Sequence, residues 1–288
     1  MSLVNVLNLS LTLLGKSLFH EIGFQVDPGD RVGLVGPNGS GKTTLLKMLV
    51  ALLKPQRGEV LIDNRNIKEY AQKDLYQRVG LVLQNPRDQL FAPTVEDDVA
   101  FGPRNLGLSE EEVQQRVSLA LESVGALKLK QRAIHHLSFG EQKRVSVAGI
   151  LAMKSSTLIL DEPTAGLDPS GEEQMLRMLN RLNRENGITI VTATHSVDLL
   201  PLFADRVYVL KNGRVLRNGS VKDIFDDHEI IGRAKLRLPY IGGLLDEMKR
   251  YDGIPIGDLP LTVREARRRL VDLIPEELLV GPRVGWEK

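Results

Sequence analysis

Gly36-Pro37-Asn38-Gly39-Ser40-Gly41-Lys42-Thr43 is the most informative stretch of this 288-residue chain. It matches the pattern Gly-x-x-x-x-Gly-Lys-Thr of loops that bind nucleotide phosphates. Residues 31–35 before it are mostly apolar and β-branched, which predicts a buried strand, and leucines three and four apart over 43–53 predict a helix after it. The order strand, loop, helix is the context that the pattern requires, so we expect a triphosphate site here.

The residue types of this loop suit an anion. Glycines at 36, 39 and 41 allow backbone N–H groups to converge, and the helix N-terminus that follows adds a favourable dipole. Lys42 supplies a positive charge to the β- and γ-phosphates during catalysis, and the Thr43 hydroxyl can ligate Mg²⁺. The plain alternative is a glycine-rich turn that happens to contain Lys-Thr. We predict that the nucleotide contacts Gly36, Pro37, Asn38, Gly39, Ser40, Gly41, Lys42, Thr43 and Thr44.

Short apolar segments alternate with helical patterns along the chain. Such alternation predicts an α/β fold with a mainly parallel core sheet. The segments that predict strands lie near residues 4–14, 19–26, 31–35, 79–83, 157–160, 188–192 and 207–210. The first two precede the phosphate loop, and we expect them to form an N-terminal antiparallel β subdomain.

Residues 1–227 are predicted to form one nucleotide-binding domain. Within it, the capping-box pattern Ser109-Glu110-Glu111-Glu112 and a further helix start near Ser138 predict a helical subdomain over about 85–155, inserted between two core strands. The pattern weakens after residue 227. Residues 228–288 are therefore predicted to be a small C-terminal extension.

Acidic, amide and imidazole side chains follow three of the predicted strands. Asp161 and Glu162 come after one, Gln84 after another and His195 after a third. Ligands of open parallel sheets bind at the carboxyl ends of the strands, where the phosphate loop also lies. We therefore expect Asp161 and Gln84 to join Thr43 around Mg²⁺.

Two of these side chains are predicted to be catalytic. Glu162 would orient and deprotonate the attacking water as a general base. His195 would bond the γ-phosphate and hold Glu162 and the water in line. The plain alternatives are acids satisfied by solvent, a surface glutamine and a structural histidine.

Composition narrows the range of functions. The chain has 38 Lys and Arg against 37 Asp and Glu, without the basic excess typical of nucleic-acid binding, so we expect no nucleic-acid partner. It has no cysteine, which excludes disulfides, thiolate metal sites and cysteine nucleophiles. No apolar run approaches the roughly 18 residues that cross a bilayer. If this protein serves a membrane, it must dock on other subunits that span it.

A second motif, Leu137-Ser138-Phe139-Gly140-Glu141-Gln142-Lys143-Arg144, resembles the signature of ATP-binding-cassette (ABC) ATPases, which share the P-loop NTPase fold. The usual form is Leu-Ser-Gly-Gly-Gln, so Phe139 and Glu141 depart from it, whereas Ser138 and Gly140 keep the hydroxyl and the bare backbone. The motifs also occur in the family's order: phosphate loop, Gln84, signature, acidic pair, the loop Ala165-Gly166-Leu167-Asp168, and His195. The resemblance covers roughly residues 3–225.

The resemblance implies a head-to-tail dimer with two ATP molecules in its interface. The signature, with Ser138, Phe139, Gly140 and Glu141, would offer a second helix N-terminus to the γ-phosphate held by the partner subunit. Asp168 would couple the two sites across the interface. Hydrolysis would remove these contacts and open the dimer. Both halves of the composite site look intact, which favours a homodimer over a heterodimer of paralogous ATPases.

The adenine site departs from the family pattern. An aromatic residue near the end of the first strand usually stacks on the base, whereas this chain has Leu11-Thr12-Leu13-Leu14 there. Leu13 can give only apolar contact. We therefore expect weaker selection between ATP and GTP than in a relative with Tyr at this position.

A longer resemblance follows Gln84. Residues 84–103, Gln-Asn-Pro-Arg-Asp-Gln-Leu-Phe-Ala-Pro-Thr-Val-Glu-Asp-Asp-Val-Ala-Phe-Gly-Pro, are similar to ATPase subunits of energy-coupling-factor (ECF) transporters, which import vitamins, cobalt or nickel. The signature and the run Val145-Ser146-Val147-Ala148-Gly149 fit the cobalt-uptake ATPases especially. This likeness places Leu90, Phe91 and Pro93 beside a groove for a helix of the membrane-embedded coupling subunit. The alternative is that they only pack the helical subdomain.

Together these features predict an ATP-binding and ATP-hydrolysing subunit of an ECF importer, with Mg²⁺ as cofactor and cobalt as the favoured cargo. It would lie at the cytoplasmic face of the cell membrane as a peripheral subunit, held by membrane-embedded coupling and substrate-binding subunits. The alternatives are the ATPase of another importer, for nickel, vitamins or amino acids, and a soluble ABC protein without a transport function. The chain has neither the long coiled-coil insertion nor the second cassette of such soluble proteins.

Overall fold

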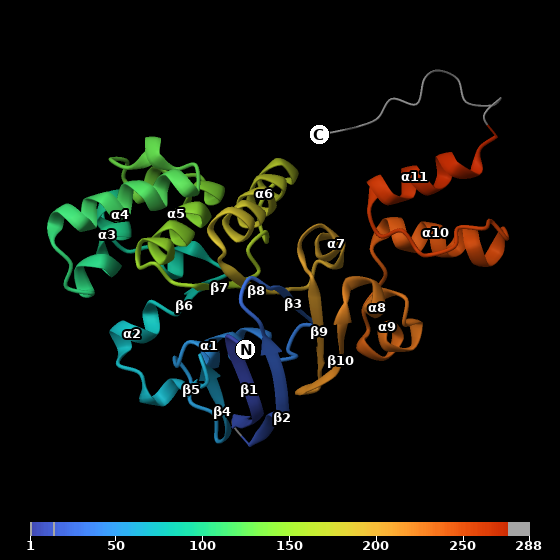
Figure 1. The fold of residues 1–288 in the computed structure, drawn as a ribbon, viewed down its shortest axis with the longest axis horizontal. Coiled ribbons are helices and arrows are strands. Elements are labelled where there is room, and N and C mark those ends of the chain that lie inside the picture. The colour runs from blue at the N-terminus through green and yellow to red at the C-terminus, as the bar shows by residue number, and fades with distance from the viewer. Residues whose placement is uncertain (1, 14, 276–288) are drawn as a thin grey trace.

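A six-stranded sheet forms the centre of the computed structural model, which describes residues 2–13 and 15–275 (Figure 1). The strand order is β10-β9-β3-β8-β7-β6, and neighbours are parallel except in the β9–β10 hairpin. The strands are β3 (Arg31–Val35), β6 (Val79–Val82), β7 (Thr157–Asp161), β8 (Thr189–Thr194), β9 (Arg206–Lys211) and β10 (Arg214–Ser220). The predicted α/β fold with a mainly parallel core sheet is confirmed.

A second, antiparallel sheet of order β2-β1-β4-β5 lies beside the first. Its strands are β1 (Val4–Leu13), β2 (Lys16–Val26), β4 (Arg57–Ile62) and β5 (Arg65–Asn66). The helix α1 (Lys42–Leu49) packs its fully buried leucines and Met48 into the core that both sheets share. The expected N-terminal antiparallel subdomain is therefore confirmed, and it holds the helix that follows the phosphate loop.

Helices cover the other end of the core sheet. They are α2 (Gln72–Tyr76), α3 (Val95–Asn105), α4 (Glu110–Ser123) and α5 (Phe139–Ala152). Side-chain oxygens of Thr94, Ser109 and Ser138 accept backbone N–H groups at the starts of the last three. Such caps satisfy N–H groups that have no partner inside the helix. The helix starts predicted at Ser109 and Ser138 are thus present.

The remaining helices of the core follow the later strands. They are α6 (Pro169–Asn186), α7 (Leu200–Phe203), α8 (Val221–Phe225) and α9 (His228–Ala234). Ile230, Ile231 and Ala234 of α9 are buried in one cluster with Val35 and Val209 of the core sheet. Helix α9 is therefore packed against the sheet, although it lies beyond residue 227. Single 3₁₀ turns occur at Ile67–Glu69, Pro86–Asp88, Leu127–Leu129, Ile134–His136 and Val197–Leu199.

Helices α10 (Tyr240–Tyr251) and α11 (Val263–Leu273) form an appendage with a small core of its own. That core consists of the buried side chains of Leu245, Ile256 and Ala266 with their partly buried neighbours. The appendage lies at the opposite end of the molecule from α3, α4 and α5 (Figure 1).

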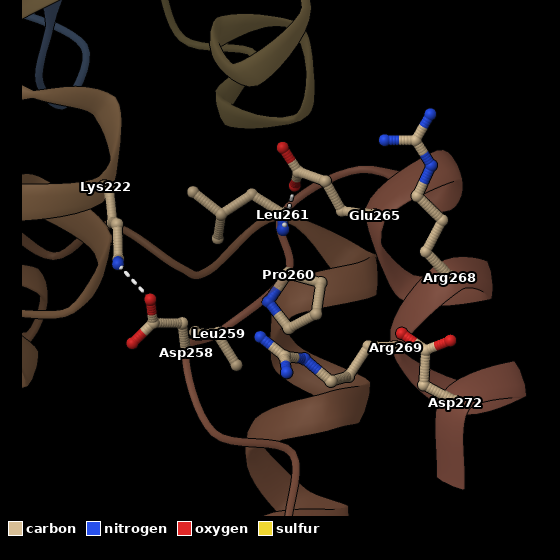
Figure 2. A pocket seen from close by; sticks show the side chains of 9 residues that line it. All are labelled: Lys222, Asp258, Leu259, Pro260, Leu261, Glu265, Arg268, Arg269 and Asp272. Carbon is tan, nitrogen blue, oxygen red and sulfur yellow. Dashed lines mark hydrogen bonds and ion pairs between the residues drawn. The ribbon is translucent and has the colours of Figure 1, made fainter.

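Polar and apolar contacts tie the appendage to the rest of the chain. His228 of α9 lies 3.4 Å from Asp246 of α10, and Leu261 is buried in one cluster with residues of the core sheet. Asp198, three residues after His195, accepts from the Arg237 guanidinium and from the backbone N–H of Tyr240 at 2.8 Å, where α10 begins. Lys222 of α8 pairs with Asp258 at 2.6 Å beside a cleft of about 410 Å³, whose opposite wall carries Arg269 (Figure 2). No helix within residues 2–13 and 15–275 is both long and apolar enough to cross a bilayer.

Candidate nucleotide-binding site

A cleft of about 450 Å³ gathers segments that are far apart in the sequence. The phosphate loop and the ends of β6, β7 and β8 all open into it, because the carboxyl ends of parallel strands share one edge of a sheet. It is lined by Leu18, Asn38, Gly39, Gly41, Lys42, Thr43, Thr44, Gln84, Asp161, Glu162 and His195. Gly36, Pro37 and Ser40 are not among its lining residues.

Two glycines of the loop cannot carry a side chain. A Cβ at Gly36 would lie 2.0 Å from the carbonyl oxygen of Leu210, and one at Gly41 would lie 2.4 Å from the ring of Phe19. Gly41 also has φ +96°, a left-handed conformation that other residues rarely adopt. The loop therefore packs directly on the two sheets at Gly36 and Gly41.

Lys42 lies under the loop that precedes it. Its Nζ donates to the carbonyl oxygens of Gly36 at 2.8 Å and Pro37 at 3.3 Å. The side chain is buried, and this burial lowers its pKa despite the opposing attraction of Glu162 and Asp161. The Lys42 ammonium is thus fixed by backbone carbonyls at the base of the cleft.

Oxygen atoms suited to a divalent cation meet beside Lys42. The Thr43 hydroxyl donates to Oδ2 of Asp161 at 2.6 Å, and Gln84 lines the same cleft. Burial raises the pKa of Asp161, and its other oxygen, Oδ1, is buried with no hydrogen-bond partner in the described part of the chain. Hydroxyl, amide and carboxylate oxygens are the donors that Mg²⁺ prefers. An unpartnered buried carboxylate oxygen fits such an ion.

Glu162 is held by hydrogen bonds at every polar group. Its carboxylate meets His195 Nδ1 at 2.7 Å through Oε1 and accepts from the Thr194 hydroxyl at 3.3 Å through Oε2. The backbone N–H donates to the carbonyl of Ala193. Only 9% of the Glu162 side chain is exposed, against 60% for His195. The carboxylate is therefore oriented by its neighbours while the imidazole reaches solvent.

The signature residues lie outside this cleft. Ser138 and Glu141 form a reciprocal capping box at the start of α5, in which the Glu141 carboxylate accepts from the Ser138 N–H at 2.7 Å. This bond is the largest cause of the lowered pKa of Glu141. Phe139 packs against Gly166, and a Cβ at Gly140 would only touch Leu167. Glu141, a departure from the usual motif, thus caps its own helix.

Asp168 also lies outside the cleft. It precedes α6, and its Oδ1 accepts from the N–H of Gly171 at 2.7 Å. The structure therefore brings together the phosphate loop, Gln84, the acidic pair and His195, and it places the signature and Asp168 on a different part of the same chain.

Sequence reasoning missed two residues near this site. Leu18 of β2 lines the cleft beside Gly41. Lys143 of α5 is 3% exposed and bonds to the backbone just after Asp161. One sequence signal could have singled out Lys143: it is followed in the same helix by the mostly apolar run 145–152. Leu13 is 46% exposed and does not line the cleft, and Leu14 lies outside the described residues.

An apolar groove of about 480 Å³ runs between α2, α3 and α5. Phe91 and Phe101 line it with rings 4.8 Å apart in an edge-to-face arrangement, and they are 65% and 50% exposed. Leu90 is instead buried in the helical core, and Pro93 is not among the lining residues. Of the three residues expected beside a groove, only Phe91 lines it.

Residues 19–165 match the ABC transporter family. A relative from Methanocaldococcus jannaschii, named energy-coupling factor transporter ATP-binding protein EcfA, is 47% identical, over 91% of this chain and 94% of that protein. The solved structure of CbiO1 from Clostridium perfringens, part of the ABC transporter complex CbiONQ, is 41% identical and superposes with a TM-score of 0.73, over 85% of this chain and 99% of that one.

A third similar protein is a dimeric ATP-binding cassette solved in a post-hydrolysis state with ADP and Pi. It is 27% identical, with a TM-score of 0.66, over 76% of this chain and 98% of that one. The family match covers half of the sequence, and the relatives match along nearly their whole length. The chain therefore belongs to the ABC transporter family, as an ATP-hydrolysing subunit of the energy-coupling-factor type.

Proposed function

We propose that two copies of this chain bind two ATP molecules head to tail and use their hydrolysis to power nutrient import by an ECF transporter. The observation that carries this proposal is the cleft where Lys42, Thr43, Asp161, Glu162 and His195 meet. Within it, Lys42 would bind phosphate, Thr43 and Asp161 would bind the cation, and Glu162 would bind the water. The γ-phosphate faces Lys42 and the backbone of the loop.

Glu162 is the proposed general base. With the carboxylate ionised, the His195 ring must donate from Nδ1 to Oε1. The ring can donate to the γ-phosphate from Nε2 as well only as an imidazolium, which carries a proton on both nitrogens. Glu162 then orients the water and takes its proton as the water oxygen bonds to the γ-phosphorus and the bond from that phosphorus to ADP breaks. Positioned general bases contribute about 10²–10⁴ to a rate.

Thr43, Gln84 and Asp161 are the proposed ligands of Mg²⁺. The Thr43–Asp161 hydrogen bond keeps the two oxygens in one place, and the unpartnered Oδ1 of Asp161 faces no competing donor among the described residues. When bound, Mg²⁺ would neutralise charge on the β- and γ-phosphates.

The signature completes the site in the partner. Because Ser138 and Gly140 lie outside their own cleft, they are free to face the nucleotide of a second copy, as the dimeric form of a related cassette supports. The exposed start of α5 would add N–H groups to the γ-phosphate. Asp168 would then lie close to the interface and couple the two sites.

Trapping the dimer tests this arrangement. Glu162→Gln should bind ATP with Mg²⁺ and form a stable dimer in size-exclusion chromatography with light scattering, because ATP persists in both sites. Adding Ser138→Arg should return the protein to monomers while ATP binding to each copy is kept. A monomer of Glu162→Gln at saturating ATP would refute the head-to-tail arrangement.

The groove around Phe91 and Phe101 is the proposed docking site for a membrane-embedded coupling subunit. Two exposed aromatic rings beside an apolar groove are typical anchors for a helix of a partner. Such docking would hold this chain at the cytoplasmic face of the membrane, next to a substrate-binding subunit.

Cobalt is the proposed cargo. The likeness to CbiO1 of the CbiONQ complex supports it, together with the resemblance of the signature region to cobalt-uptake ATPases. Co-expression with the coupling and substrate-binding subunits that co-purify with this chain, followed by uptake of radioactive cobalt and nickel, tests the proposal. Uptake of nickel or a vitamin in place of cobalt would overturn the cargo and leave the ATPase role intact.

A further inference from the structure

Helix α5 carries a buried lysine that the nucleotide cleft does not use. Lys143 is 3% exposed and lies one turn after the signature residues Phe139 and Gly140. Its Nζ donates to the carbonyl oxygens of Glu162 at 2.8 Å and Pro163 at 3.0 Å. Two consecutive peptide carbonyls of the loop after β7, which carries the proposed base Glu162, are therefore bonded to α5, the helix that begins with the signature.

The loop that Lys143 contacts is strained. Glu162 has φ +47°, a left-handed conformation that is costly for a residue with a side chain. Its carbonyl oxygen also accepts from Ala165 N–H at 3.2 Å. Bonds from an ammonium are stronger than bonds between neutral groups, so Lys143 helps to hold this backbone conformation.

The ammonium is shielded from water on its signature side. Nζ lies 5.4 Å from the centre of the Phe139 ring, within the range of a cation–π contact. The same ring packs on Gly166 of the loop that leads to Asp168. Burial lowers the pKa of Lys143 to about 8, which leaves the ammonium as the main form at neutral pH. Phe139 thus contacts both Lys143 and the loop before Asp168.

We propose that Lys143 is a positioning residue for ATP hydrolysis, which fixes the Glu162 carboxylate by holding the backbone of residues 162 and 163 against the signature helix. The inference rests on the proposed function, because it takes Glu162 as the base of one site and the start of α5 as part of the other. In a head-to-tail dimer, α5 of one chain touches the ATP of the partner, whereas Glu162 acts on the ATP of its own chain. Lys143 then connects α5 to the backbone of Glu162, and so connects the two sites.

Steady-state kinetics of Lys143→Met test this role, since Met has a similar length and no charge. We expect kcat to fall by at least about tenfold and the KM for ATP to stay within about threefold, the pattern for a group that acts only on the chemical step. Lys154→Met, an exposed lysine just after the same helix, is the matched control and should change neither constant. A kcat equal to that of the wild type would overturn the proposal.

A double-variant cycle separates positioning from a general structural role. If Lys143 acts through Glu162, the residual turnover of Glu162→Gln should be the same with and without Lys143→Met. Further loss in the double variant would mean that Lys143 acts elsewhere. The double variant should also still form the ATP-bound dimer, and failure to do so would assign Lys143 to holding the signature helix instead.

The outcomes keep the two proposals apart. Full activity of Glu162→Gln would refute the role of Glu162, and the role of Lys143 with it. An inactive Glu162→Gln beside a fully active Lys143→Met would refute only the role of Lys143. If Lys143→Met does not fold, Lys143→Gln takes its place with the same expected loss and the same contrary result.

Discussion

At the scale of single residues, Lys42 is buried and its ammonium has two backbone hydrogen-bond acceptors. Its ammonium bonds to Gly36 and Pro37 carbonyls and lies beneath the loop. Lys42→Ala should weaken ATP binding by about 100-fold, because a charge-assisted contact to phosphate is worth up to about 3 kcal/mol. Isothermal titration measures this change. Lys54→Ala, an exposed lysine beyond α1, should bind ATP normally, and an unchanged affinity in Lys42→Ala would contradict the assignment.

Lys143 also makes stability depend on pH. Its pKa is lowered to about 8 in the folded chain, so between about pH 8 and pH 10 the unfolded chain binds more protons there. Stability from this residue therefore rises with pH across that window, by about 2 kcal/mol. Urea unfolding at both pH values should show the wild type gaining this much over Lys143→Met. A constant difference between the two proteins would show that the lysine is not desolvated.

The adenine of a bound nucleotide is expected beside Leu13. Leu13 is 46% exposed and offers no aromatic ring. We expect Michaelis constants for ATP and GTP to differ by less than about 100-fold, which corresponds to about 2.7 kcal/mol. Steady-state hydrolysis of both nucleotides measures the ratio, with Leu13→Tyr as a variant that should favour ATP. A larger ratio in the wild type would reveal a base contact that the sequence does not show.

At the scale of elements, α3 presents the aromatic edge of the groove. Asp98 accepts from the backbone N–H groups of Phe91 at 2.9 Å and Ala92 at 3.0 Å, which fixes the loop before the helix. Phe91→Ala with Phe101→Ala should abolish co-purification with membrane subunits and leave the ATPase rate of the isolated chain unchanged. Leu119→Ala, an exposed leucine on α4 away from the groove, is the control. Capture that survives the double variant would place the docking surface elsewhere.

Sequence patterns identified the helices and strands whose capping residues or apolar periodicity match the burial seen in the structure. The strands on either side of the phosphate loop and the caps at Ser109 and Ser138 were predictable because their signals are local. Strand β4 was missed because only Val60 and Ile62 of its six residues are buried, too few to show a period. Helix α10 was missed because it begins after Pro239 without a side-chain cap.

The same distinction applies to the candidate site. Gln84, Asp161 and His195 could be placed because each lies at or just after the end of a strand of one sheet, so topology alone brings them together. The orientation of Leu90 into the helical core and the contact of Lys143 with the carbonyls of Glu162 and Pro163 depend on how α3 and α5 pack. Spacing in the sequence does not encode that packing.

At the scale of the whole molecule, the cassette and the appendage differ in how much they bury. The appendage core contains three buried residues, whereas the clusters on either side of the sheet contain many times more. Amides of α10 and α11 should therefore exchange with deuterium faster than those of β3, β7 and β8, since local opening costs less free energy there. Hydrogen exchange followed by mass spectrometry measures this order. Equal protection in both regions would mean that the chain opens as one unit.

Helices α4 and α11 lie at opposite ends of the long axis of the molecule (Figure 1), so a distance between them can be measured within one chain. Since no native thiol competes for a label, cysteines introduced at the exposed positions Glu111 and Arg264 would take a pair of fluorophores or spin labels at defined ends. Both labels stay clear of the cleft and of the aromatic groove. Motion of the helical end relative to the appendage during turnover can then be followed as a distance within one polypeptide.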